Sequence, residues 1–137
     1  MANVLTPKAR GTLTKVGTLA RTDTTAKELF GLPKGAIIIG IYVIGAAASN
    51  AGTTATIGIG STTSANEYMT GYDVKTAATG EGYNVAGGAA VGSAMATPIA
   101  SDLPVYGIYA ESGVASSSGG DWTIKVEYYL AGPGETL

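Results

Sequence analysis

Carboxylates, lysines and hydroxyls are the side chains from which this 137-residue chain would have to build an active site, because it contains no histidine and no cysteine. Two pairs of acids are close enough in sequence to face one cleft, as the two carboxylates of a glycosidase do: Asp73 with Glu81, and Glu111 with Asp121. Each acid falls at the end of a predicted strand or in a Gly/Ser-rich loop, where solvated carboxylates are ordinary. We therefore expect no catalytic residue and no enzyme activity.

The same two absences limit metal and cofactor chemistry. A Ser/His/Asp triad, a thiol nucleophile, a disulfide and a zinc site all need histidine or cysteine. The segment Gly58–Thr63 begins like a phosphate-binding glycine loop, but the third glycine is missing and no helix is predicted to follow. The closely spaced acids of a calcium loop are also absent, which leaves open only a weak ion site made by one loop carboxylate and backbone carbonyls. We expect no cofactor and no metal.

Charge is distributed unevenly along the chain. Residues 1–34 contain six basic and two acidic side chains, a net charge of +4, whereas residues 35–137 contain two basic and eight acidic ones, a net charge of −6. An acidic partner surface, or the acidic remainder of a neighbouring subunit, would suit the basic segment. The alternative is that its lysines keep an edge strand from aggregating.

Four basic residues are candidate contacts to a partner: Lys8, Arg10, Lys15 and Arg21. They are spaced singly and have no interleaved aromatic residues that could stack on bases. We therefore expect a protein partner and no nucleic-acid partner.

Short segments in which apolar and polar residues alternate recur along the chain, separated by Gly, Ser, Thr, Asn and Pro. This pattern predicts an all-β fold. About seven or eight such strands, without helices to cover a parallel sheet, favour a single domain built as an antiparallel β-sandwich or jelly roll. The predicted organisation is an N-terminal arm over residues 1–11, a β-sandwich over residues 12–131 and a C-terminal tail over residues 132–137.

The most apolar strand is predicted over Ala36–Ile44, after a proline-glycine turn at Leu32–Gly35. It is β-branched on both faces, which predicts a central strand covered on both sides, within a sandwich or at a subunit contact. The next strand, Thr53–Gly60, alternates clearly and places Ala55 and Ile57 on one face. We expect these two strands to form a hairpin.

Three other segments give weaker signals. Thr12–Ala20 is weakly amphipathic, as expected of an edge strand, and Ala26–Phe30 is either a strand or one helical turn. Residues Thr76–Ala96 are mostly Ala, Gly, Thr and Ser, which predicts a long loop that could pair with a neighbouring subunit.

The last strand has the clearest pattern, because apolar and polar residues alternate strictly from Trp122 to Leu130. Trp122 and Tyr128 lie on its apolar side and are expected in the core. Tyr129 lies on the polar side, where an interface is the favoured role because tyrosine is enriched at protein contacts. A sugar-stacking platform, as in carbohydrate-binding modules, is the alternative.

The predicted core is thin, since the chain has one tryptophan and one phenylalanine. Association of subunits would add burial, so we expect a homo-oligomer, either a dimer or a trimer. The apolar run Ala36–Ala48 is shorter than the roughly 20 residues that span a bilayer, and we expect no membrane partner. The start, MANVLTPKAR, shows no apolar signal-peptide region, which predicts synthesis in the cytoplasm.

One stretch, Leu29–Gly60 (LFGLPKGAIIIGIYVIGAAASNAGTTATIGIG), resembles the small head-decoration, or cement, proteins of tailed bacteriophages. In that family a leucine-proline-x-glycine-alanine turn leads into an apolar strand, a small-residue loop and a Thr-rich strand that ends in Gly-x-Gly. A late strand with the pattern of Ile124–Tyr129 closes the domain. The resemblance of pattern extends over about residues 10–131.

The resemblance implies a virion protein that binds in many copies to the outside of an icosahedral head and bridges major capsid subunits. It carries over no catalytic residues. An N-terminal arm often makes the shell contact in such proteins, which would suit residues 1–21. A head fibre, a tail protein or another minor virion component is the alternative, and a carbohydrate-binding module is a more distant one.

Overall fold

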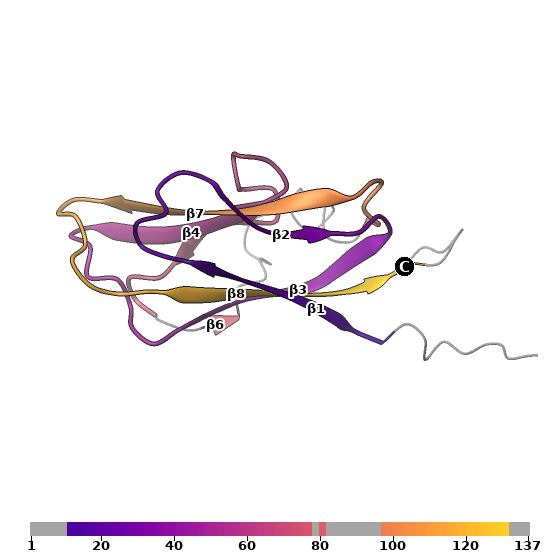
Figure 1. Cartoon of the computed structure of the whole chain (residues 1–137). Helices are drawn as coiled ribbons and strands as arrows, with labels where there is room; N and C mark the ends of the chain where they lie inside the picture. Colours follow the sequence, from indigo (N-terminus) through magenta and orange to yellow (C-terminus); the bar gives the residue numbers. More distant parts are fainter. Residues whose placement is uncertain (1–10, 78–79, 82–96, 132–137) are drawn as a thin grey trace, which may run out of the picture.

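The computed structural model describes residues 11–77, 80–81 and 97–131, which form eight strands and no helix. The strands lie in two four-stranded antiparallel sheets that face each other (Figure 1). The predicted antiparallel β-sandwich is therefore confirmed. The strands are β1 (Leu13–Leu19), β2 (Lys27–Leu32), β3 (Ala36–Gly45), β4 (Thr54–Gly60), β5 (Met69–Asp73), β6 (Gly80–Glu81), β7 (Leu103–Ser112) and β8 (Trp122–Leu130).

The order of the strands is that of a jelly roll. One sheet runs β1-β8-β3-β6 and the other β2-β7-β4-β5. The first strand therefore pairs with the last, the second with the seventh, the third with the sixth and the fourth with the fifth, as in a long hairpin rolled up on itself. Both β1 and β2 are edge strands, which confirms the prediction for residues 12–20.

The core forms where the period-two patterns of the two sheets meet. Ile57 and Ile59 of β4 point inward from one sheet, and Ile124 and Val126 of β8 point inward from the other, all fully buried. Burial of each such side chain contributes about 1.5–3 kcal/mol. Trp122 lies in the same core, as predicted.

Trp122 stacks on an aromatic side chain of the opposite sheet. Its ring centroid lies 5.5 Å from that of Tyr109, with 15° between the ring planes. Tyr109 and Trp122 are both fully buried, and Tyr128 is 5% exposed. The prediction that Trp122 and Tyr128 belong to the core is therefore confirmed.

The predicted hairpin between β3 and β4 is wrong, because these consecutive strands lie in different sheets. The loop between them crosses from one sheet to the other and is held by backbone hydrogen bonds from Ser49 N to Val74 O (2.8 Å) and from Gly52 N to Val114 O (2.7 Å). Each strand has a strongly apolar face, and the two faces meet across the sandwich interior.

The ambiguous segment 26–30 is part of a strand. Pairing with β7 extends it to Lys27–Leu32, and a register shift between Glu28 and Phe30 leaves Leu29 without a partner opposite. The predicted loop 76–96 contains β6, and residues 78–79 and 82–96 lie outside the described residues. So do the predicted arm up to residue 10 and the predicted tail, residues 132–137.

We expect Ile57→Ala to lower the free energy of unfolding by about 2–5 kcal/mol, because it removes a fully buried side chain from a central strand. Ile44→Ala is the matched control, since Ile44 is 42% exposed, and it should cost about 1 kcal/mol or less. Urea unfolding followed by the fluorescence of Trp122, the single tryptophan, measures both. Equal losses in the two variants would contradict this assignment of the core.

Candidate interaction surfaces

Of the acid pair Glu111 and Asp121, Glu111 serves a structural network. Its carboxylate accepts hydrogen bonds from the hydroxyl of Tyr109 (2.7 Å) and from the backbone N–H of Ser116 (3.2 Å). The same tyrosine hydroxyl lies 2.7 Å from Oγ of Ser49 in the loop between β3 and β4. Ser49 and Ser116 are both buried. Glu111 and its partners therefore fix the two loops that flank the Tyr109–Trp122 stack, while Asp121 is exposed.

Asp73, from the pair with Glu81, is also used locally. Its carboxylate accepts hydrogen bonds from the backbone N–H of Lys75 (2.8 Å) and from the hydroxyl of Thr76 (2.7 Å), and so closes the turn after β5. Within the described part of the chain, no group of three or more His, Cys, Asp or Glu side chains could hold a metal ion. The described residues also contain no helix long and apolar enough to cross a membrane.

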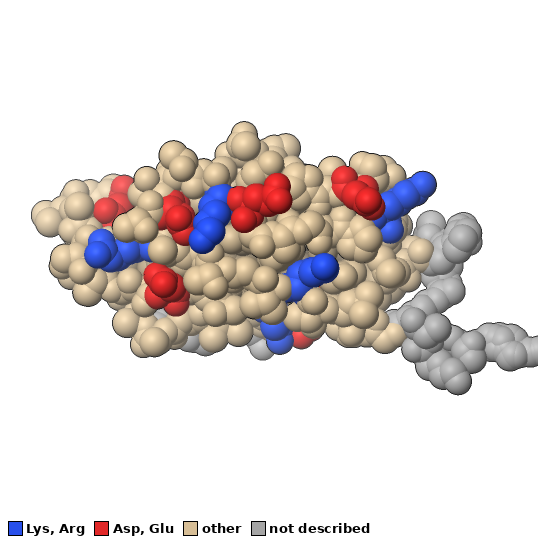
Figure 2. Space-filling view, in the orientation of Figure 1, with Lys and Arg blue, Asp and Glu red and all other residues tan. Residues whose placement is uncertain are grey.

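The described part of the basic segment forms no continuous basic patch on the face drawn in Figure 2. Figure 2 shows basic and acidic side chains interspersed over one face of the sandwich. Arg21 donates a hydrogen bond from Nη1 to the carbonyl of Ser116 (2.8 Å), close to Glu111, so it belongs to the loop network. Lys15 is exposed on β1, and Lys8 and Arg10 lie outside the described residues. Contact of these residues with a partner stays a prediction.

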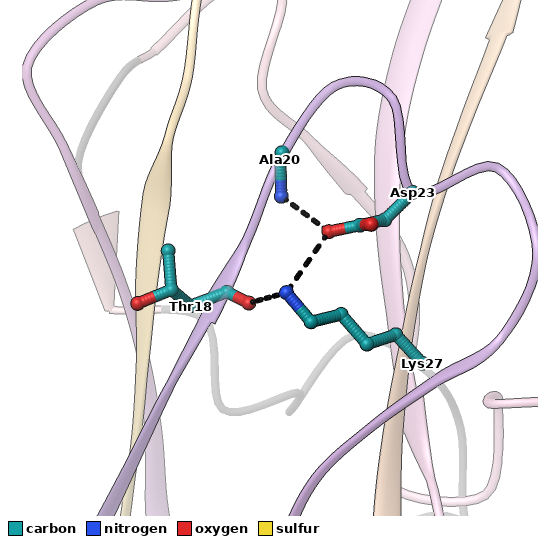
Figure 3. Close-up of polar contacts among 4 residues, drawn as sticks. All are labelled: Thr18, Ala20, Asp23 and Lys27. Atoms are coloured by element: carbon teal, nitrogen blue, oxygen red, sulfur yellow. Dashed lines mark hydrogen bonds and ion pairs between the residues drawn. The ribbon is translucent and has the colours of Figure 1, made fainter.

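Lys27 has a defined role at the edge of the sandwich (Figure 3). Its Nζ donates a hydrogen bond to the carbonyl of Thr18 in β1 (2.9 Å) and lies 3.4 Å from Oδ2 of Asp23, which also accepts from the N–H of Ala20 (2.7 Å). A backbone acceptor of the edge strand is thereby occupied by a lysine. This agrees with the alternative interpretation of the basic segment, in which its lysines protect an edge.

The outward side of the β1-β8-β3 sheet forms a surface with an apolar border, which we call the outer face. Trp122, Ile124 and Val126 point into the core, so the residues that alternate with them on β8 point outward. Cross-strand neighbours share a side, which aligns Val16, Lys125 and Tyr42 in one outward row.

Lys125 is the centre of this outer face. Its Nζ lies 3.2 Å from Oε1 of Glu127 and 4.8 Å from the centroid of the Tyr42 ring. The hydroxyl of Tyr42 donates a hydrogen bond to Oε2 of Glu127 (3.3 Å). These three side chains hold one another in place, so the polar centre of the face is ordered before any partner binds.

Large apolar side chains border this polar centre. Val16 is 55% exposed and Ile44 is 42% exposed, while Ile39, at the register shift in β3, is 40% exposed. The prediction that β3 is covered on both sides is therefore not met at Ile39 and Ile44, whereas Ile37, opposite Tyr129 on the outward side, is buried. Tyr129 is half-buried on the outward side of β8, and its role at an interface stays a prediction.

A second surface feature is a groove of about 460 Å³ between the edge strands β1 and β2. Its floor is mostly apolar, and three charged residues line its rim: Lys15, Glu28 and Asp102. The lining residues are Lys15, Glu28, Gly31, Leu32, Pro33, Asp102, Leu103, Pro104 and Tyr128. Of these lining residues, only Lys15 is among the contact residues predicted from the sequence, because the groove depends on how far apart the two sheets lie.

Comparison with known proteins finds a likeness in fold and none in sequence family. No protein-family model matches the sequence, and neither does any curated protein at a significant level. Among solved structures, the fold matches a chain of the cyanophage Pam1 capsid asymmetric unit with a TM-score of 0.64. The two chains share a fold. The match covers 96% of this chain and 93% of that chain, at 17% sequence identity.

The loop network gives a prediction for acid stability. Hydrogen bonds from Ser116 and Tyr109 lower the pKa of Glu111 below its ordinary value of 4.5. A carboxyl whose pKa is lower in the folded than in the unfolded state stabilises the fold above the unfolded value, and that contribution is lost as pH falls through the folded pKa. Glu111→Gln should therefore be less stable than the natural protein at about pH 6, and the difference should narrow steadily below pH 4.5.

Thermal unfolding at a series of pH values measures this difference. Asp121→Asn removes the same charge from an exposed position and controls for the change in net charge. A deficit of Glu111→Gln that stays constant from neutral to acid pH would contradict the role assigned to the ionised carboxylate.

Proposed function

We propose that the protein is a structural subunit of a phage virion that binds the outside of an icosahedral head and bridges adjacent major capsid subunits. The observation that carries the proposal is the jelly-roll likeness to a chain of a phage capsid asymmetric unit, because it spans nearly the whole of both chains. The resemblance of Leu29–Gly60 to head-decoration proteins rests on residue patterns and supports the same assignment independently.

The proposed role is mechanical and non-enzymatic. Asp73 and Glu111, the acids most suited to catalysis by their spacing, are engaged in a turn and in a loop network. What the described surface offers a partner is shape, apolar area and ordered polar groups. Those are the properties that a bridging subunit needs.

The outer face is the surface that we assign to the shell. It combines exposed Val16 and Ile44 with the ordered polar centre of Lys125, Glu127 and Tyr42. Aromatic and aliphatic anchors around satisfied polar groups are typical of binding hot spots. Many copies on one shell would multiply a modest affinity per subunit, because neighbouring contacts act together.

The subunit would act as a homo-oligomer at the virion surface after synthesis in the host cytoplasm. Oligomers at the junctions between capsid subunits would place several outer faces on one shell. The copy number per particle tests this part of the proposal. Hundreds of copies per head support decoration, whereas a few copies would indicate a fibre, a tail protein or another minor component.

We expect Val16→Asp to weaken binding to expanded, undecorated heads of the parent phage by about tenfold or more, because it replaces an exposed apolar side chain of the outer face with a charged one that must be desolvated at the contact. Val114→Asp is the matched control: Val114 is 78% exposed in the loop between β7 and β8, and this variant should bind as the natural protein does. Co-sedimentation with purified heads measures both variants.

Two results would count against the proposal. Failure of the natural protein to bind heads near stoichiometrically would overturn the decoration role. Equal binding by Val16→Asp and the natural protein would overturn the assignment of the outer face and leave decoration through another surface.

A further inference from the structure

The groove between β1 and β2 exists because the two sheets separate at one end of the sandwich. Leu13, Lys15 and Leu19 share one side of β1, yet Leu19 is fully buried while Leu13 is 42% exposed and Lys15 is exposed. The sheets touch at Gly17, where an added Cβ would lie 2.8 Å from Cβ of Leu29. From Lys15 toward Leu13, β1 and β2 diverge (Figure 1). The inward side of β1 is therefore not covered by the opposite sheet there, and this space is the groove.

The lining of the groove suits an extended peptide with apolar and basic side chains. Leu32, Leu103 and Tyr128 give the groove an apolar floor. Glu28 and Asp102 outnumber Lys15 on the rim, so the rim favours a cationic occupant. Because β1 and β2 are edge strands, the walls also present backbone edges of the kind that accept an added strand.

The first ten residues of the chain, MANVLTPKAR, have the matching chemistry. They contain the apolar pair Val4 and Leu5, the basic residues Lys8 and Arg10, and no acid. Ten extended residues reach about 33–36 Å, whereas β1, with seven residues, is about 23 Å long. The segment is therefore long enough to follow the whole groove.

We propose that the groove of one subunit binds residues 1–10 of a second copy in an extended conformation. Gly11 and Thr12 lead into β1 without a turn, so a segment that returned to its own groove would have to reverse within residues 1–10 and would lose length for binding. This exchange of residues 1–10 rests on the proposed homo-oligomer. It specifies the contact that would hold the subunits together. Two targets were open for the basic segment, an acidic partner surface and the acidic part of a neighbouring subunit. The proposed exchange favours the neighbouring subunit.

A truncated chain and a synthetic peptide test the proposal without phage heads. Deletion of residues 1–10 leaves all eight described strands in place, and cooperative urea unfolding checks that the truncated protein folds. Fluorescence anisotropy of a labelled MANVLTPKAR peptide should show saturable binding to the truncated protein, whose groove has no competing arm. A peptide with Lys8→Glu and Arg10→Glu should bind at least about fivefold more weakly, because the groove rim is acidic.

Variants of the groove give the decisive comparison. Glu28→Lys should weaken peptide binding at least about fivefold, whereas Asp121→Lys, the same reversal at an exposed site away from the groove lining, should leave it unchanged. In the full chain, Glu28→Lys should lower the mass measured by sedimentation, and Asp121→Lys should not. This second readout remains informative if the truncated protein does not fold.

Absence of saturable binding, or equal weakening by Glu28→Lys and Asp121→Lys, would overturn the groove as the binding site. A full chain that stays monomeric at all concentrations would overturn the exchange between copies. Because no heads are present, these results are independent of the head-binding experiment.

Discussion

Pairing between the first and last strands is the constraint on which this sandwich depends. β8 lies between β1 and β3, so it hydrogen-bonds on both sides and carries Trp122, Ile124 and Val126 into the core. The pairing of β8 with β1 joins the two ends of the domain and its pairing with β3 joins strands far apart in sequence, which makes the sheet a product of long-range contacts. The opposite sheet then packs on β8 through the stack of Tyr109 on Trp122. The ordered loops and the outer face both follow from the position of β8.

Much of the fold could be predicted because period-two patterns report local burial. The alternation in β4 and β8 correctly identified their inward residues, and the edge position of β1 followed from its weak amphipathicity. The choice of partner strand could not be predicted in the same way. β3 and β4 each show an apolar face, but nothing in their sequences says whether those faces lie side by side or opposite each other. The crossing loop and its bonds to Val74 and Val114 decide this.

The interaction surfaces were less predictable, because they combine residues from distant strands. Tyr129 was placed correctly on the outward side from alternation alone. The row of Val16, Lys125 and Tyr42 requires the register of three strands, which no short pattern contains. The role of Arg21 in the fold was also not predictable, because its guanidinium donates to the carbonyl of Ser116, which is 95 residues away in the sequence. On the face drawn in Figure 2, basic and acidic side chains of the described residues likewise lie next to one another, although they are separated along the sequence.

The pairing of Leu13 with Tyr128 also means that both ends of the described domain leave from the same pole of the sandwich. The loops around Ser49 and Ser116 occupy the opposite pole, next to the pair of Leu19 with Trp122. For protein engineering, this geometry makes the domain a natural display scaffold. Partners fused directly to the ends of the described domain would project from one pole together, and a circular permutant could join those ends and open the chain in the exposed loop between β7 and β8 without changing the strand order.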